Sequence, residues 1–214
     1  MNFKVIHKKA VLNVLAVNFN SKIKSIDFIK PLIEKVASPL VAVLPAGEYA
    51  LYIRDLKEYS IDNKYPGGHT YNPFESMVAL PSWNFNHADI EAVVAHELHH
   101  LARWHYTGYG LSLGEAVISE GLASLYEEEI SNIKPAWAKA KVDKESLQKL
   151  IKDWNDKNYN HAEWFFDGKY GRWFGYSVGY RIAKQIYPNG IDLRDSLKRT
   201  IKPIDFDVIK LIDK

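Results

Sequence analysis

One stretch in the middle of the chain, residues 86–108, reads NHADIEAVVAHELHHLARWHYTG. Its apolar residues recur at spacings of three and four, which is the period of an amphipathic helix. The positions that follow this period are Ile90, Val94, Leu98 and Leu101. Asp89 lies near the start of the stretch, where a carboxylate is stabilised by the helix dipole. We therefore predict one long helix that ends near Gly108 and buries its apolar face.

The same helix contains His96-Glu97-Leu98-His99-His100, which matches the pattern H-E-x-x-H, and His96 and His100 lie on the face opposite the apolar residues. At about 100° per residue, His96 and His100 lie about 40° apart, so both imidazoles can reach one Zn²⁺ ion. Glu97 lies beside them and can hydrogen-bond a water molecule. The sequence therefore predicts a metal site, although three histidines on a polar helix surface would give the same pattern.

Composition narrows the classes of protein that fit. The chain has 214 residues, 28 Lys and Arg against 26 Asp and Glu, and a net charge of +2. This balance gives no support to a basic nucleic-acid-binding protein. There is no cysteine, which excludes a disulfide framework, a thiol nucleophile and cysteine ligands for a metal. Any metal must therefore bind through histidine and carboxylate side chains.

No apolar run is long enough to span a membrane, because that requires about 20 residues. The longest candidate, residues 10–19, is interrupted by Asn13 and Asn18. The same segment lacks the features of a secretory signal peptide. We expect a soluble, cytoplasmic protein without a membrane or nucleic-acid partner.

A zinc hydrolase needs a third protein ligand and leaves the fourth position open for water. The pattern with a further downstream histidine is excluded, because Arg103 and Tyr106 stand where it requires glycine and histidine. Glu120 is the first candidate, since a second helix could return to the first and Gly121 would permit their close approach; Glu115, nearer the turn, is the alternative. Three residues could accept a hydrogen bond from a metal-bound imidazole: Asp89, Ser124 and Glu127.

The rest of the chain predicts an α+β fold in a single domain, residues 1–214, with a mixed part over 1–85 and a helical part over 86–214. In the first part, residues 11–19 suggest a strand or a short buried helix, of which we favour the helix. We also expect a helix over 25–36, a buried strand over 40–44, a turn at 66–68 and an edge strand over 76–80. Peptide substrates could add to that edge strand. An active-site cleft is expected between the two parts.

In the second part we expect helices over 113–130, 144–152 and 176–185, and helix, turn and short helix over 193–214. Residues 154–187 are dense in aromatic side chains, which is typical of a core and the wall of a cleft. Gly175 and Gly179 lie four apart and would let their helix pack closely against the zinc helices.

Three segments resemble a known family when taken together. They are AHELHH at 95–100, SEGLAS at 119–124 and WFGYSVGYRI at 173–182. In this order they are similar to DUF2268, a family of predicted zinc-dependent proteases, and in type to the gluzincins. The resemblance implies a zincin-like metallopeptidase in which His96, His100 and Glu120 hold one zinc ion. It supplies no substrate, and the first 70 residues carry no matching motif.

The expected reaction is hydrolysis of a peptide bond by a metal-activated water, with Glu97 as general base. The tetrahedral intermediate needs a donor for its oxyanion. Tyr176 is the first candidate, followed by Tyr180, His161 and Arg172. A tyrosine packed in an aromatic core would explain Tyr176 equally well.

Other functions use the same sequence features. The main alternative is a zinc-containing binding or regulatory module without turnover. Glu97 favours the enzyme, because a non-catalytic relative has no chemical need for a carboxylate at that position. Hydrolysis of a non-peptide amide would use the same residues. We therefore expect a peptide or protein substrate, while the oligomeric state stays open.

Overall fold

The computed structural model describes residues 2–17, 26–59, 61, 65–80 and 86–212. The described part has an α+β fold with one five-stranded sheet and seven α-helices. It forms two compact units, Met1–Tyr106 with Ile130–Ile133, and Thr107–Glu129 with Lys134–Lys214. We describe each unit by itself. Among the described helices, none combines the length and the hydropathy needed to cross a membrane.

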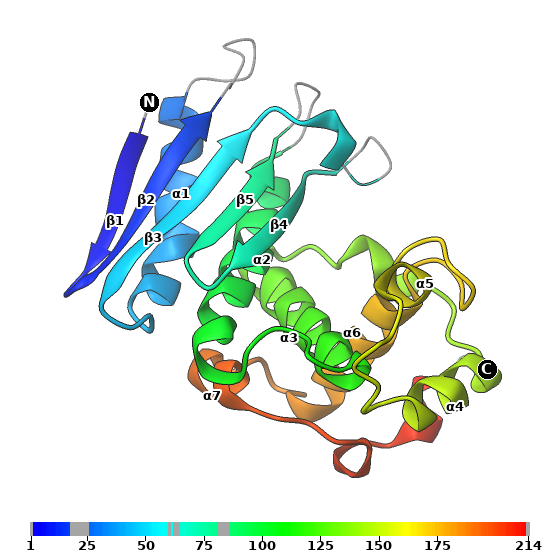
Figure 1. Cartoon of the computed structure of the whole chain (residues 1–214). Helices are drawn as coiled ribbons and strands as arrows, with labels where there is room; N and C mark the ends of the chain where they lie inside the picture. The colour runs from blue at the N-terminus through cyan, green and yellow to red at the C-terminus, as the bar shows by residue number, and fades with distance from the viewer. Residues whose placement is uncertain (1, 18–25, 60, 62–64, 81–85, 213–214) are drawn as a thin grey trace. The chain divides into compact units, whose positions relative to one another are not determined.

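The first unit contains the whole sheet (Figure 1). Its strands are β1 (Asn2–His7), β2 (Ala10–Val17), β3 (Gly47–Arg54), β4 (Gly67–Asn72) and β5 (Glu75–Ala79). They lie in the order β1-β2-β3-β5-β4. The three central strands β2, β3 and β5 are parallel, and the two outer strands run antiparallel to their neighbours. β4 is therefore an edge strand.

Helices α1 (Ile26–Val41) and α2 (His87–Thr107) lie on the same side of this sheet (Figure 1). Alternate residues of β2 and β3 are buried, including Leu12 and Leu51, and β5 is buried without a break from Ser76 to Ala79. The two helices also contact each other, since Lys35 forms an ion pair of 2.7 Å with Glu91. The predicted central helix is confirmed, and the sheet and α1 position it from one side.

Two predictions for the start of the chain are wrong. Residues 10–17 form strand β2 rather than a helix, while 18–25 lie outside the described residues. The prediction failed because a short apolar run has no period that distinguishes a helix from a strand. In the structure the side-chain amide of Asn13 donates a hydrogen bond to the backbone carbonyl of Tyr49 on β3. Residues 40–44 are the end of α1 and a turn rather than a strand, because the predicted helix continues through Pro31 and Pro39.

The prediction for the sheet edge is also wrong. Residues 75–79 form β5, which has β3 on one side and β4 on the other, so this strand is internal. The edge is β4, and it includes Gly67 and Gly68, which the sequence suggested as a turn. Of the two prolines near the predicted edge strand, Pro73 precedes β5, and Pro81 lies outside the described residues.

The second unit is built from helices. They are α3 (Leu113–Ser131), α4 (Lys144–Lys152), α5 (His161–Phe165), α6 (Phe174–Ile186) and α7 (Leu193–Lys198). The predicted helices over 113–130, 144–152 and 176–185 are confirmed, and the chain ends in 3₁₀ turns at Pro203–Asp205 and Val208–Leu211. The aromatic segment supplies the core of this unit, with Trp154, Trp164, Phe165, Phe174 and Tyr187 buried.

Candidate metal centre

His96 and His100 lie one helical turn apart on α2 and direct their rings toward each other. Their Nε2 atoms are 3.0 Å apart, and the ring centroids are 4.7 Å apart at an interplanar angle of 77°. Only 7% of His96 and 3% of His100 is exposed. The sequence prediction that the two imidazoles share one face of the helix is confirmed.

The spacing of the two Nε2 atoms is suited to binding one metal ion. Tetrahedral zinc with Zn–N bonds of about 2.0–2.1 Å places two histidine nitrogens about 3.3 Å apart. The observed 3.0 Å between the Nε2 atoms is close to this value. The pair therefore fits zinc by donor type and by spacing.

Glu97 is buried between α2 and the edge strand β4. Its Oε2 accepts a hydrogen bond of 2.8 Å from the hydroxyl of Thr70, and 6% of the residue is exposed. The backbone of Gly68 lies against the same side chain, since a Cβ on Gly68 would fall 2.4 Å from Glu97 Cγ. The carboxylate is thus held by residues of β4 as well as by its own helix.

Glu120 lies on α3 in the second unit and is 3% exposed. The hydroxyl of Tyr109 donates a short hydrogen bond to its Oε1. Tyr159 lies nearby: burial raises the pKa of its phenol above the ordinary value, and the negative charges of Glu120 and Glu115 raise it further. The phenols of Tyr109 and Tyr159 therefore both accompany this carboxylate.

Glu115, the alternative third ligand, is engaged at the start of α3. Its Oε2 accepts a hydrogen bond of 3.1 Å from the backbone N–H of Ser112, while the hydroxyl of Ser112 accepts one of 3.4 Å from the N–H of Glu115. This reciprocal pair is a capping box, which stabilises the first turn of a helix. The sequence Ser-Leu-Gly-Glu at 112–115 carries the signature of that motif.

Within the described part of the chain, one set of three side chains has the composition of a metal-binding group, and all three are buried: His96, His100 and Glu120. Two imidazoles and one carboxylate are a donor set that zinc accepts. Because thiolates are absent from the chain, these are also the ligand types that the sequence left available.

Tyr176, the predicted oxyanion donor, lies on α6 in an aromatic cluster of the second unit. Its ring centroid is 4.9 Å from that of Trp137 and 5.2 Å from that of Phe165. Tyr180 donates its hydroxyl to Glu128 instead, and burial together with this carboxylate raises the pKa of the Tyr180 phenol.

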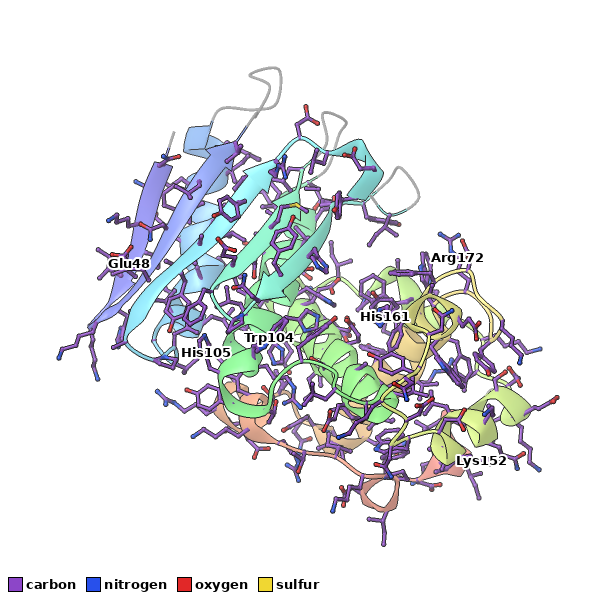
Figure 2. The ribbon with its side chains drawn as sticks, in the orientation of Figure 1. Glu48, Trp104, His105, Lys152, His161 and Arg172 are labelled. Atoms are coloured by element: carbon purple, nitrogen blue, oxygen red, sulfur yellow. The ribbon has the colours of Figure 1, made fainter. Side chains whose placement is uncertain are left out.

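The two other candidates for the oxyanion donor are labelled in Figure 2. His161 stacks on Phe165 with 4.3 Å between ring centroids. The guanidinium of Arg172 lies 4.0 Å from the centroid of the Trp173 ring.

Two of the residues that could accept a hydrogen bond from a metal-bound imidazole, Ser124 and Asp89, have hydrogen-bond partners in the structure, and so does His105. Ser124 accepts a hydrogen bond of 2.8 Å from the indole of Trp137. Asp89 exchanges hydrogen bonds with Asn86 at the start of α2. His105, labelled in Figure 2, bonds the carbonyl of Pro73 through its Nε2 at 2.6 Å. These contacts give each residue a role in holding its own unit together.

Sequence reasoning missed three residues that contact the candidate catalytic and metal-binding carboxylates: Gly68, Thr70 and Tyr109. None belongs to a motif, because each reaches its carboxylate through the fold. Tyr109 could have been suspected, since it lies between two glycines in the short connection that precedes α3. Thr70 and Gly68 gave no such signal, because they lie on a strand that the sequence did not predict.

Comparison with known families adds an independent finding. The model of DUF2268, described as a predicted Zn-dependent protease, matches residues 28–198 of this 214-residue chain. The chain belongs to this family. The match includes both candidate histidines, Glu97 and Glu120, and it confirms the resemblance found in the three motifs. No curated protein and no solved structure matches the chain.

Proposed function

We propose that this member of DUF2268 is a zinc-dependent peptidase. The observation that carries the proposal is the arrangement on α2: His96 and His100 direct their Nε2 atoms to within 3.0 Å of each other, and the buried carboxylate of Glu97 lies next to them in the helix. A carboxylate in this position serves as a general base, whereas a site that only stored or sensed the metal would not need it.

In this proposal His96, His100 and Glu120 hold the metal. When bound, zinc supplies Lewis acidity and lowers the pKa of a water molecule to about 7. Glu97 accepts a proton from the attacking water and then delivers it to the leaving amine. Burial of Glu97 keeps bulk water away from the carboxylate, so the proton stays within the reacting groups.

Glu120 is preferred to Glu115 as third ligand on the basis of their surroundings. Glu115 already takes part in the capping box in the first turn of α3, at the N-terminal end of this helix. Glu120 is 3% exposed and is paired with the phenol of Tyr109, as expected for a ligand oriented by a neighbouring donor. The family description supports zinc as the metal.

The substrate in this proposal is an extended peptide that pairs with β4. Among the described strands, β4 pairs with β5 alone, so its other side is the edge of the sheet. Its residues Gly68 and Thr70 contact Glu97. A peptide that adds to this edge would run alongside the general base. Tyr176 stays the candidate oxyanion donor within the same proposal.

The test is metal content, measured by elemental analysis of the purified protein, together with cleavage of an unstructured protein such as casein. We expect about one zinc per chain in the wild type and in Glu97→Gln, with turnover in the wild type alone. Glu120→Ala should lose the metal, and the matched control Glu115→Ala should keep it. A chelator should abolish cleavage.

Other outcomes lead to different conclusions. If Glu115→Ala loses the metal and Glu120→Ala keeps it, the proposed third ligand is wrong. Zinc bound by the wild type without cleavage of any peptide would support the alternative, a zinc-containing module without turnover. A wild type that takes up no zinc would contradict the proposal as a whole.

A further inference from the structure

The edge strand β4 lies against both oxygens of the Glu97 carboxylate. Gly68 and Thr70 are two residues apart, so they present the same side of the strand. A Cβ on Gly68 would fall 2.7 Å from Oε1, while the hydroxyl of Thr70 lies 2.8 Å from Oε2. The missing side chain at Gly68 makes room for the carboxylate, and Thr70 provides a hydrogen bond to it.

The Thr70 hydroxyl has three oxygens within hydrogen-bonding distance. They are Glu97 Oε2 at 2.8 Å, the Glu97 backbone carbonyl at 3.0 Å and Ser76 Oγ at 2.9 Å. A hydroxyl carries one proton, and a carboxylate is the strongest acceptor of the three. Thr70 therefore donates to Glu97, and Ser76 is the donor to Thr70.

All three side chains of this chain of hydrogen bonds are buried. Thr70 is 5% exposed, Ser76 is inaccessible and Glu97 is 6% exposed. In such surroundings a carboxylate that rotates away from Thr70 loses this hydrogen bond, and little bulk water is present to replace it. Ser76 lies on β5, so the hydrogen bonds connect the internal strand β5 to the edge strand β4, and β4 to helix α2.

We propose that Thr70 is a positioning residue: Ser76 donates to Thr70, Thr70 donates to Glu97, and this relay fixes the orientation in which Glu97 presents its carboxylate. The inference rests on the proposed peptidase function for its catalytic meaning. The hydrogen-bonded arrangement itself is independent of that function, so the two can be tested separately.

The catalytic test compares Thr70→Val, which keeps the shape and removes the hydroxyl, with Thr70→Ser, which keeps the hydroxyl. We expect Thr70→Val to lower kcat roughly 10- to 100-fold, the loss expected for one hydrogen bond to a charged group, with KM and zinc content unchanged. Thr70→Ser should recover most of the rate. Thr200→Val, a matched change at an exposed position, should leave kcat unchanged.

Ser76→Ala provides a second catalytic comparison. Because Thr70 keeps its own proton in this variant, we expect a smaller loss of kcat than in Thr70→Val. If Thr70→Val has wild-type kcat, or if Thr70→Ser loses as much as Thr70→Val, the hydroxyl has no positioning role and the inference is wrong.

A second readout does not require activity. Melting temperatures in chelator are measured for the wild type, Thr70→Val, Glu97→Met and the double variant. If the hydroxyl bonds the carboxylate, the two single shifts should together exceed the double shift by at least about 3 °C. Additive shifts would overturn the inference. A wild type without peptidase activity but with non-additive shifts would contradict the proposed function and leave the Thr70–Glu97 arrangement supported.

Discussion

Gly121 on α3 lies directly against the backbone of Gly179 on α6. A Cβ on Gly121 would fall 2.1 Å from the carbonyl oxygen of Gly179, and a Cβ on Gly179 would fall 2.1 Å from the carbonyl oxygen of Val117. The two helices therefore meet backbone to backbone, one residue away from Glu120. The predicted close approach of the Gly179 helix to the Glu120 helix is confirmed, whereas Gly175 lies against the ring of Phe165.

Gly179→Ala should destabilise the protein although alanine is the better helix former. The added methyl group would meet backbone atoms, which cannot move away as a flexible side chain can. We expect a loss of about 3 kcal/mol or more in the free energy of unfolding, at the upper end for overpacked sites. The melting temperature should fall by roughly 6–12 °C. Thermal unfolding followed by circular dichroism measures this change.

Gly171→Ala is the matched control for that substitution. Gly171 has a φ of +95° and no neighbouring atom within 4 Å of an added Cβ, so alanine there is strained in conformation but meets no steric contact. We expect a loss of about 1–2 kcal/mol. Equal effects of the two variants would show that close helix packing is not what Gly179 provides.

Tyr109→Phe should weaken metal binding without unfolding the protein. The phenol donates a hydrogen bond to Oε1 of Glu120, and its loss removes one contact that orients this carboxylate. Residues that orient metal ligands typically contribute 10- to 100-fold in affinity. Zinc affinity measured by competition with a chelator should fall within this range. An unchanged affinity would indicate that Glu120 is oriented by other contacts or is not a ligand.

The sequence predicted the long helices well and the strands poorly. Helices α2, α3 and α4 have enough residues for a period of three and four to be recognised. Strand β2 is a short apolar run, and strand β4 contains two adjacent glycines and lacks an apolar alternation. Its place at the sheet edge is set by pairing with β5, a tertiary contact that no local pattern reports.

The same division applies to the candidate site. His96, Glu97 and His100 belong to one helix, so their spacing in the sequence determines their spacing in space. Thr70 meets Glu97 across 27 positions of the chain, and only the folded strand brings the two together. Glu115 could have been assigned as a helix cap from the sequence, because the capping box has a local signature.

Tyr126 should make stability fall at alkaline pH. It is buried on α3, and burial, followed by the negative charge of Glu129, raises the pKa of its phenol to about 12. An unfolded tyrosine titrates near pH 10. The protonated Tyr126 phenol therefore contributes to the free energy of unfolding in full below pH 10, and this contribution is lost as the pH rises through about 12. Its upper limit is about 2–3 kcal/mol.

Tyr126→Phe isolates this contribution from the other tyrosines. Between pH 9 and about pH 12, the free energy of unfolding from urea titrations should fall more steeply in the wild type than in the variant. Parallel curves for the two proteins would mean that the Tyr126 phenol ionises at its ordinary pKa.

Gly68→Ala should impair catalysis while sparing metal binding. The new methyl group would lie 2.4 Å from Glu97 Cγ and 2.7 Å from Cδ, so the proposed general base must move out of its present position. The proposed metal ligands His96 and His100 are not displaced, and we expect zinc content to stay at the wild-type level. Because a small misplacement of a reacting group can lower the rate about 100-fold, kcat should fall by roughly that factor.

The control for Gly68→Ala is His69→Ala, on the opposite face of the same strand, where the side chain is exposed. This variant should keep kcat within about twofold. Because the atoms displaced belong to one side chain and not to the backbone, the Gly68→Ala protein should also melt within a few degrees of the wild type. A normal rate in Gly68→Ala would mean that Glu97 can leave its present position without losing function, and it would contradict both the assigned base and its support by β4.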